Sequence, residues 1–268
     1  MKQLLIGFEG LDASFKQTNA RSLYEYFYNK YRDKVDSGKL YLDLVSFPRY
    51  KKSSSVYVRK YLKKDFDKVI DYFVPNSLFA TNPVYDVASL TSSFFMLDML
   101  DWYTECYNKG VFEKDHIIIF DRYYYSMMYY LTPRLHEEIN FSRIKSQKKI
   151  MKYEYDTVLN TPAFKLLPKL DAVIKLKTDS ESIKDHLNYR KTNKDKYESD
   201  IAYLSKVNEL FNKLDFTELL SDNNEYRIDA VQQIDVDIVG KSREEVFDDI
   251  LYGSKSVLNR LSRMRWLK

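Results

Sequence analysis

The sequence predicts an α/β protein in which five parallel strands form one sheet with helices on both faces. Short apolar runs alternate with longer segments whose apolar residues recur at helical spacing, which is typical of a parallel sheet. The run His116–Phe120, "HIIIF", is apolar beyond its histidine, like a strand that is buried on both faces. Only six Gly and six Pro occur among 268 residues, so no linker is visible and we expect one domain with insertions.

The expected strands are the apolar runs without a helical period. The first leads into a turn that contains glycine, Pro48 ends the second, and the fifth has the weakest pattern. The five expected strands are Gln3–Phe8, Leu40–Phe47, His116–Phe120, Ala172–Lys177 and Glu225–Ala230.

The expected helices lie between these strands. In the first helix, apolar residues recur close to a period of about 3.6 residues, at Ala20, Leu23, Tyr24, Phe27 and Tyr31. A short capped helix is expected over Ser53–Leu62, and a longer one over about residues 86–107. The last expected helix, Ser242–Leu251, begins with a serine cap and has Glu244 and Glu245 in its first turn.

The single cysteine and the N-terminal segment bear on the cellular compartment. Cys106 excludes an internal disulfide and fits a reducing compartment, and its place in an apolar helical pattern predicts that it is buried. The N-terminal apolar run is too short for a signal sequence or a membrane span. We therefore expect a cytoplasmic protein that does not bind a membrane.

Positive charge gathers in the tail, residues 255–268. The formal net charge is +4, and these fourteen residues hold five cations and no acids, so the body has a net charge of −1. The body therefore gives no general case for nucleic-acid binding. The tail has apolar residues along one helical face, which indicates a helix docked on the body or, alternatively, one that binds a partner or an acidic surface. These apolar residues are Val257, Leu258, Leu261 and Met264.

The stretch "GFEGLDASFKQT" nearly matches a phosphate-binding loop, G-x-x-x-x-G-K-[ST], between a strand and a helix. Gly10 and Lys16 match this pattern, whereas Phe15 and Gln17 stand in place of a glycine and a hydroxyl residue. Such loops surround a phosphate with backbone N–H groups at a helix N-terminus. A second interpretation needs no ligand, because Ser14 followed by Gln17 is also the pattern of a capping box at an ordinary helix start.

Five segments, in order along the chain, resemble the thymidylate kinase family. Together they span residues 3 to about 250, and each lies where the family has it relative to the expected strands. The segments are "FEGLDASFKQT" (8–18), "SFPRY" (46–50), "DRYYYSMMYY" (121–130), "RKTNKDKYESDIAYLSKV" (190–207) and "GKSREEV" (240–246). The resemblance implies a three-layer P-loop kinase fold and transfer of the γ-phosphoryl group of ATP, with Mg²⁺, to a deoxynucleoside monophosphate, dTMP or an analogue.

The resemblance also implies roles for individual residues. Lys16 contacts the phosphates of the donor, Arg122 holds the acceptor phosphate, and Arg190 is the cation of a lid. The implied catalytic residues are Lys16, Asp121, Arg122 and Arg190. The implied ATP-binding residues are Gly10, Ser14, Lys16, Gln17 and Thr18, and the implied Mg²⁺ ligands are Gln17 and Asp121. The implied acceptor-binding residues are Asp12, Phe47, Arg49, Tyr50, Phe95, Arg122 and Tyr130.

The sequence departs from the family at four positions. A Cβ at Phe15 strains a backbone that the family builds with glycine, and its ring either turns into the core or fills the phosphate site. Gln17 replaces a hydroxyl that ligates Mg²⁺. Met99 stands in place of an arginine that reads the base, and Leu131 in place of a glutamine, so the base that is accepted stays open.

The resemblance divides the chain into a P-loop domain, 1–254, and the basic tail, 255–268. The domain contains an extended, charged, helical connection at 131–168 and the lid at 188–200. The resemblance also implies a homodimer. The leading hypothesis is an active nucleoside-monophosphate kinase, and the alternative is a catalytically silent relative that serves as a binding or structural subunit. A third hypothesis, a kinase that acts on nucleic-acid ends or modified bases, is supported by the basic tail alone.

Overall fold

The computed structural model describes residues 3–11, 14–63, 65–66, 83–127, 166–183, 201–217 and 231–262, of which 83–89 and 260–262 are described by their backbone alone. In this part of the chain the strands form one five-stranded sheet. The strands are β1 (Gln3–Glu9), β2 (Leu40–Ser46), β3 (Asp115–Asp121), β4 (Ala172–Lys177) and β5 (Gln232–Asp237).

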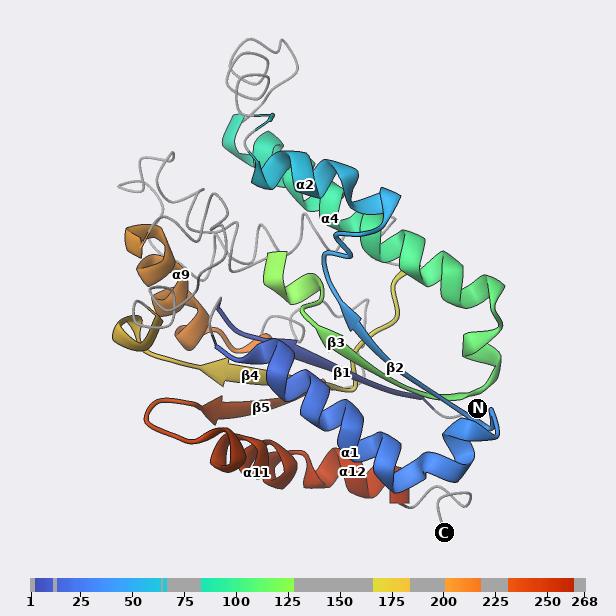
Figure 1. The fold of residues 1–268 in the computed structure, drawn as a ribbon. Coiled ribbons are helices and arrows are strands. Elements are labelled where there is room, and N and C mark those ends of the chain that lie inside the picture. The colour runs from blue at the N-terminus through green and yellow to red at the C-terminus, as the bar shows by residue number, and fades with distance from the viewer. Residues whose placement is uncertain are drawn as a thin grey trace.

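The strand order is β2-β3-β1-β4-β5, and every neighbouring pair is parallel. The chain places β2 and β3 on one side of β1, and β4 and β5 on the other. The carboxyl end of β1 therefore lies where the strand order reverses, which is the usual position of ligands in such sheets. In Figure 1 the arrows of β4 and β5 point to the left, so this edge of the sheet is on the left.

One face of the sheet is covered by α1 (Lys16–Asp36), α11 (Arg243–Gly253) and α12 (Lys255–Ser262) (Figure 1). Helix α1 buries the apolar positions that its period predicted, among them Leu23 and Phe27, against β1 and β3. Gly253 lies against β5, since a Cβ there would stand 2.5 Å from Ile234 Cγ2. The C-terminal helices thus pack directly on the edge strand.

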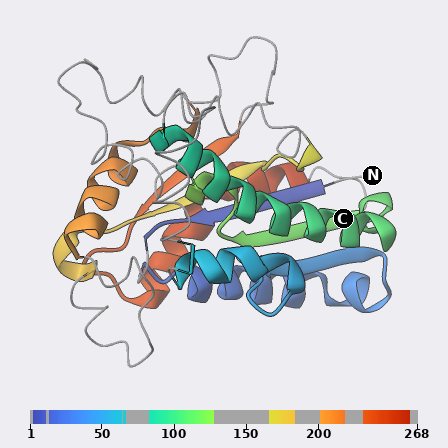
Figure 2. The ribbon, with the colours of Figure 1, turned by 90° about the horizontal axis from the view of Figure 1, so that it is seen from above.

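The opposite face is covered by helices that follow β2, β3 and β4. They include α2 (Val56–Leu62), α4 (Pro83–Asn108) and α9 (Ile201–Lys213), with short 3₁₀ turns η1 (Ser53–Ser55) and η2 (Val111–Glu113). Figure 2, which looks down on this face, shows α2 and α4 lying over the sheet. With helices on both faces, the described residues confirm the predicted fold class.

Four of the five predicted strands are confirmed. The predicted range 225–230 lies outside the described residues, and β5 runs over Gln232–Asp237. This edge strand pairs with β4 and buries only alternate residues, such as Ile234 and Val236. Its pattern is therefore half polar, unlike the apolar runs of the inner strands.

The tail docks on the body over the residues that the structure describes. Val257 is buried and Leu258 is partly buried in the same apolar cluster as α1 and β5. The docked interpretation is therefore confirmed for α12. Cys106 is also buried as predicted, and burial raises the pKa of its thiol to about 11.

Among the helices of the described ranges, none is both long enough and apolar enough to cross a membrane.

Candidate functional site

The candidate site lies at the carboxyl edge of the sheet, where β1, β3 and β4 end side by side. Phe8 of β1 is paired with Asp121 of β3, and Glu9 is paired with Lys175 of β4. The loop after β1 and the turn after β3 therefore begin next to each other. Lys16 and Arg122, predicted for different phosphates, come from these two neighbouring connections.

Gly10 occupies a position that admits no side chain. A Cβ there would stand 2.6 Å from Ser14 Oγ and 3.0 Å from the carbonyl oxygen of Leu176. Both contacts are closer than real Cβ atoms make without displacement of a neighbour. The loop after β1 is thus folded tightly on itself and against the end of β4, which accounts for the first glycine of the motif.

Phe15 has a left-handed backbone, with φ 57° and ψ 23°. This is the conformation for which glycine is favoured, and a side chain in it costs about 1–2 kcal/mol. Phe15 is 40% exposed and belongs to none of the apolar clusters. The expectation of strain is therefore confirmed, and the alternative in which the ring turns into the core is wrong.

The capping box that the sequence offered at this helix does not form. Phe15, not Ser14, is the residue that precedes α1, and the side chain of Phe15 makes no capping hydrogen bond. The carbonyl of Phe15 accepts hydrogen bonds from the backbone N–H and the side-chain Nδ2 of Asn19, both at 3.0 Å. The interpretation of "SFKQ" as an ordinary capped helix start is thus wrong.

Lys16 is buried in its own loop. Its side chain donates to the carbonyl of Leu11, and Nζ lies 3.5 Å from Ser14 Oγ. Only 6% of Lys16 is exposed, and Ser14 is fully buried. The ammonium group is therefore held against the loop between Gly10 and α1, and its predicted contact with a phosphate stays a prediction.

The turn after β3 has a second left-handed residue. Arg122 has φ 67°, and it and Phe15 are the non-glycine residues with positive φ in the described part of the chain. The Arg122 N–H donates to the carbonyl of Phe8 at 3.1 Å, and the carbonyl of Asp121 accepts from the N–H of Phe47 at 3.0 Å. Such strained backbone persists where surrounding contacts fix it, and it concentrates at functional sites.

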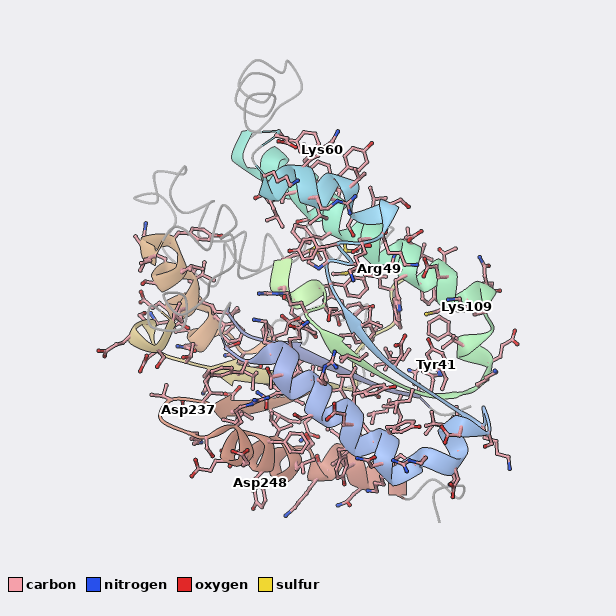
Figure 3. All side chains as sticks on the ribbon, in the orientation of Figure 1. Tyr41, Arg49, Lys60, Lys109, Asp237 and Asp248 are labelled. Carbon is pink, nitrogen blue, oxygen red and sulfur yellow. The ribbon has the colours of Figure 1, made fainter. Side chains whose placement is uncertain are left out.

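Arg49 is placed differently from Arg122. Its Nε lies 3.0 Å from Asp98 Oδ1 and its Nη1 lies 3.2 Å from Glu105 Oε2. Nη2 also pairs with Asp101, so the guanidinium group contacts three carboxylates of α4. Figure 3 shows Arg49 beside this helix. In this structure its charge fixes α4 to the segment after β2, and its predicted role in acceptor binding stays a prediction.

The other predicted acceptor residues of this region fall into three environments. Phe47 is buried among the rings of Trp102, Phe120 and Tyr123. Tyr50 is exposed, and Phe95 is half-buried between two apolar clusters. Phe47 is thus a core residue, whereas Tyr50 and Phe95 keep surface that a ligand can reach.

The possible Mg²⁺ ligands are few. Gln17 is exposed, and Asp121 and Thr18 are half-buried. The backbone carbonyl of Thr18 accepts a hydrogen bond from the hydroxyl group of Ser22. Within the described ranges no group of three His, Cys, Asp or Glu side chains is arranged to hold a metal ion. Mg²⁺ usually keeps several waters and takes one or two carboxylates with substrate phosphates, so one carboxylate at Asp121 fits that chemistry.

Three predicted residues lie outside the described residues: Asp12, Tyr130 and Arg190. The lid at 188–200 and most of the connection at 131–168 also lie outside them. Met99 is described, and it is buried in the apolar cluster that contains Trp102.

Three buried charged residues were not predicted from the sequence: Asp98, which pairs with Arg49, and Glu9 and Lys175. Glu9 is fully buried at the end of β1, and Lys175 is 1% exposed in β4. Lys175 donates to the carbonyls of Asn212 and Leu214 at the end of α9, and burial lowers its pKa to about 8. A charged residue within an apolar run, as in "AVIKLK", was the available signal for Lys175.

The comparisons with known proteins add no family. No family model matches the chain, and no curated protein matches its sequence significantly.

Proposed function

We propose that this protein is a nucleoside-monophosphate kinase of the thymidylate kinase type. It would transfer the γ-phosphoryl group of ATP, with Mg²⁺, to a deoxynucleoside monophosphate, dTMP or a close analogue. The observation that carries the proposal is the pairing of two unusual turns at one edge of the sheet. Lys16 follows the left-handed Phe15 after β1, and Arg122 is itself left-handed after the neighbouring β3.

This arrangement suits phosphoryl transfer, which needs positioning and charge stabilisation more than covalent chemistry. An ammonium group at the first loop and a guanidinium group at the second would hold a donor and an acceptor phosphate side by side. The planar guanidinium of Arg122 suits a terminal phosphate better than an ammonium group does. Asp121 would supply a carboxylate for Mg²⁺, and Arg190 would approach with the lid.

The alternative function is a silent relative that binds a partner. Phe15 favours it, because this exposed aromatic residue stands in the loop after β1 in place of the family's glycine, and Arg49 favours it through its engagement with α4. The two functions differ in one property, since only a kinase needs the loop after β1 to bind a triphosphate.

The experiment is a calorimetric titration with ATP and Mg²⁺, followed by phosphoryl transfer from ATP to dTMP, dUMP, dCMP, dAMP and dGMP. We expect binding and turnover, and we expect Lys16→Met to lower turnover by roughly 100-fold or more. Lys241→Met is the matched control, because Lys241 lies before α11 and pairs with Asp249 at 2.7 Å. Absence of ATP binding at millimolar concentration would remove the kinase and leave the silent alternative.

We also propose that the protein is a cytoplasmic homodimer, as its proposed type implies. Leu90 and Leu97 support the dimer, because they are 43% and 49% exposed and lie seven residues apart on one side of α4. Sedimentation of the full chain tests it, and a monomer at micromolar concentration would contradict it.

A further inference from the structure

Glu9 is a fully buried carboxylate between the two connections that form the candidate site. It is the last residue of β1, directly before Gly10. Its neighbours across the sheet are the ends of β3 and β4. Burial of a carboxylate is costly unless hydrogen bonds compensate for the lost water, so its contacts indicate what it does.

Each carboxylate oxygen of Glu9 accepts a hydrogen bond from the turn after β3. Oε1 accepts from the backbone N–H of Tyr123 at 2.9 Å, and Oε2 accepts from the hydroxyl group of Ser126. The preceding N–H, of Arg122, donates to the carbonyl of Phe8 at 3.1 Å. Two successive N–H groups of the turn are therefore bound by two successive residues of β1.

The left-handed backbone of Arg122 makes this double contact possible. A left-handed residue turns successive N–H groups toward one side of the chain, where they can receive an anion. The carboxylate of Glu9 stands in that position. The conformation costs free energy for any residue other than glycine, and buried hydrogen bonds to a charged acceptor are strong enough to offset it.

We propose that Glu9 is a positioning residue that fixes the Arg122 turn and so sets the place of Arg122 relative to the phosphate loop. The inference rests on the proposed function for its catalytic consequence. Glu9 is joined covalently to Gly10 and by hydrogen bonds to the residues after Arg122, so it links the donor side of the site to the acceptor side. Phosphoryl transfer is sensitive to displacements of about 1 Å between such groups.

The first test does not need activity. Hydrogen exchange of the Arg122 and Tyr123 amides is measured in Glu9→Ala and Glu9→Gln. We expect Glu9→Ala to accelerate exchange at Tyr123 by about tenfold or more. Glu9→Gln should have a smaller effect, because its amide can still accept from Tyr123 while Ser126 turns its hydroxyl group to accept. Unchanged exchange in both variants would overturn the proposal.

Asp171→Asn is the matched control. Asp171 is a carboxylate before β4 that accepts from the N–H of Leu5 at 2.8 Å, so it contacts β1 at the opposite edge of the sheet. We expect this variant to alter exchange at Leu5 and to leave Arg122 and Tyr123 unchanged. Faster exchange at Tyr123 in Asp171→Asn would show a general loosening of β1 and would overturn the specific role of Glu9.

The second test uses turnover of the full chain. We expect Glu9→Ala to lower kcat by about tenfold to 100-fold and to raise KM for the monophosphate, with the Kd of ATP unchanged, and Glu9→Gln to lower kcat less. A purely structural role would alter neither kcat nor KM of the folded variant. Turnover equal to that of Asp171→Asn would overturn the proposal. If the unaltered chain transfers no phosphoryl group, the proposed function fails by itself, and the exchange measurement still decides whether Glu9 holds the turn.

Discussion

Helices α1 and α11 begin with the same kind of sequence and with different structures. "SREE" before α11 forms a complete capping box, in which Ser242 Oγ accepts from the N–H of Glu245 at 3.2 Å and the Glu245 carboxylate accepts from the N–H of Ser242 at 2.8 Å. "SFKQ" at α1 offers Ser14 and Gln17 at the same spacing, but the residue before that helix is Phe15, whose side chain makes no capping hydrogen bond.

The backbone explains the difference. Ser242 has an extended conformation, φ −68° and ψ 165°, from which a serine side chain reaches the first turn of its helix. At α1 the residue before the helix is Phe15 in the left-handed region, so Ser14 lies one position too early. Ser14 is buried near Lys16 instead, whereas Ser242 and Glu245 are exposed to solvent.

The contrast indicates that the two helix starts serve different purposes. An exposed start with a complete capping box is a device for stability. Where the residue before a helix does not cap it, other side chains, backbone groups, water or a ligand satisfy the first N–H groups. The tight Gly10 contact and the buried Lys16 at the α1 start accord with the proposed phosphate site.

Glycine substitutions at the two starts should change stability in opposite directions, and this is the largest contrast in stability that we expect between them. Phe15→Gly relieves the left-handed strain, so the free energy of unfolding should rise by about 0.5–1 kcal/mol after the entropy of glycine is subtracted. Ser242→Gly should lower it by a few tenths of a kcal/mol, roughly the usual loss for such a change. Urea denaturation measures both.

Phe15→Gly and a second variant, Phe15→Ala, separate the effect of the Phe15 backbone from the effect of its ring. Phe15→Ala removes the ring and keeps the Cβ, so it should not stabilise the chain. If the ring obstructs the loop, both variants should bind ATP more tightly, by about tenfold for each 1.4 kcal/mol gained. Tighter binding in Phe15→Gly alone would assign the obstruction to the backbone. A loss of stability in Phe15→Gly would contradict the role of strain.

Alanine at the two serines should give a smaller contrast. Ser242→Ala removes a formed cap and should cost about 1 kcal/mol of stability. Ser14→Ala removes no cap, so it should cost less than half as much, although Ser14 is the more buried of the two. Thermal denaturation of both variants checks this. An equal or larger cost at Ser14 would mean that its hydroxyl supports the loop in a way that the capping comparison does not include.

The fold could be predicted from the sequence because the inner strands carry a simple signal. β3 and β4 are buried on both faces, and their residues are apolar almost without interruption, apart from Lys175. The sequence pattern did not predict β5, because this strand lies at the edge of the sheet and its Ile234 and Val236 alternate with exposed Asp235 and Asp237. Alternation of polar and apolar residues over only six positions is a weak strand signal, and it is no stronger than that of the neighbouring stretch "EYRIDA".

The site was only partly predictable, because it depends on contacts between distant residues. The motif identified Gly10 and Lys16, and the structure places them in one tight loop. It could not show that Arg49 meets Asp98, which lies 49 residues along the chain, or that Glu9 binds Tyr123, 114 residues away. Spacing within a motif describes local geometry, and these pairs arise only when the sheet assembles.

The smallest expected effect concerns pH, because the two starts differ in titratable groups. The backbone N–H of Ser242, followed by the side-chain contact of the same serine, holds the pKa of Glu245 below its ordinary value of 4.5. A carboxyl group with a lowered pKa contributes stability above its unfolded pKa and loses that contribution as pH falls through its folded pKa. The α11 cap should therefore weaken in acidic solution as Glu245 is protonated, whereas α1 has no acid in its first turn.

An NMR titration that follows the amides of Ser242 and Gln17 measures both helix starts at once. Glu245→Gln should abolish the shift at Ser242, because the glutamine amide does not titrate. A matching shift at Gln17 would mean that a carboxylate caps α1 as well, and the two helix starts would then be alike in the property that separates them here.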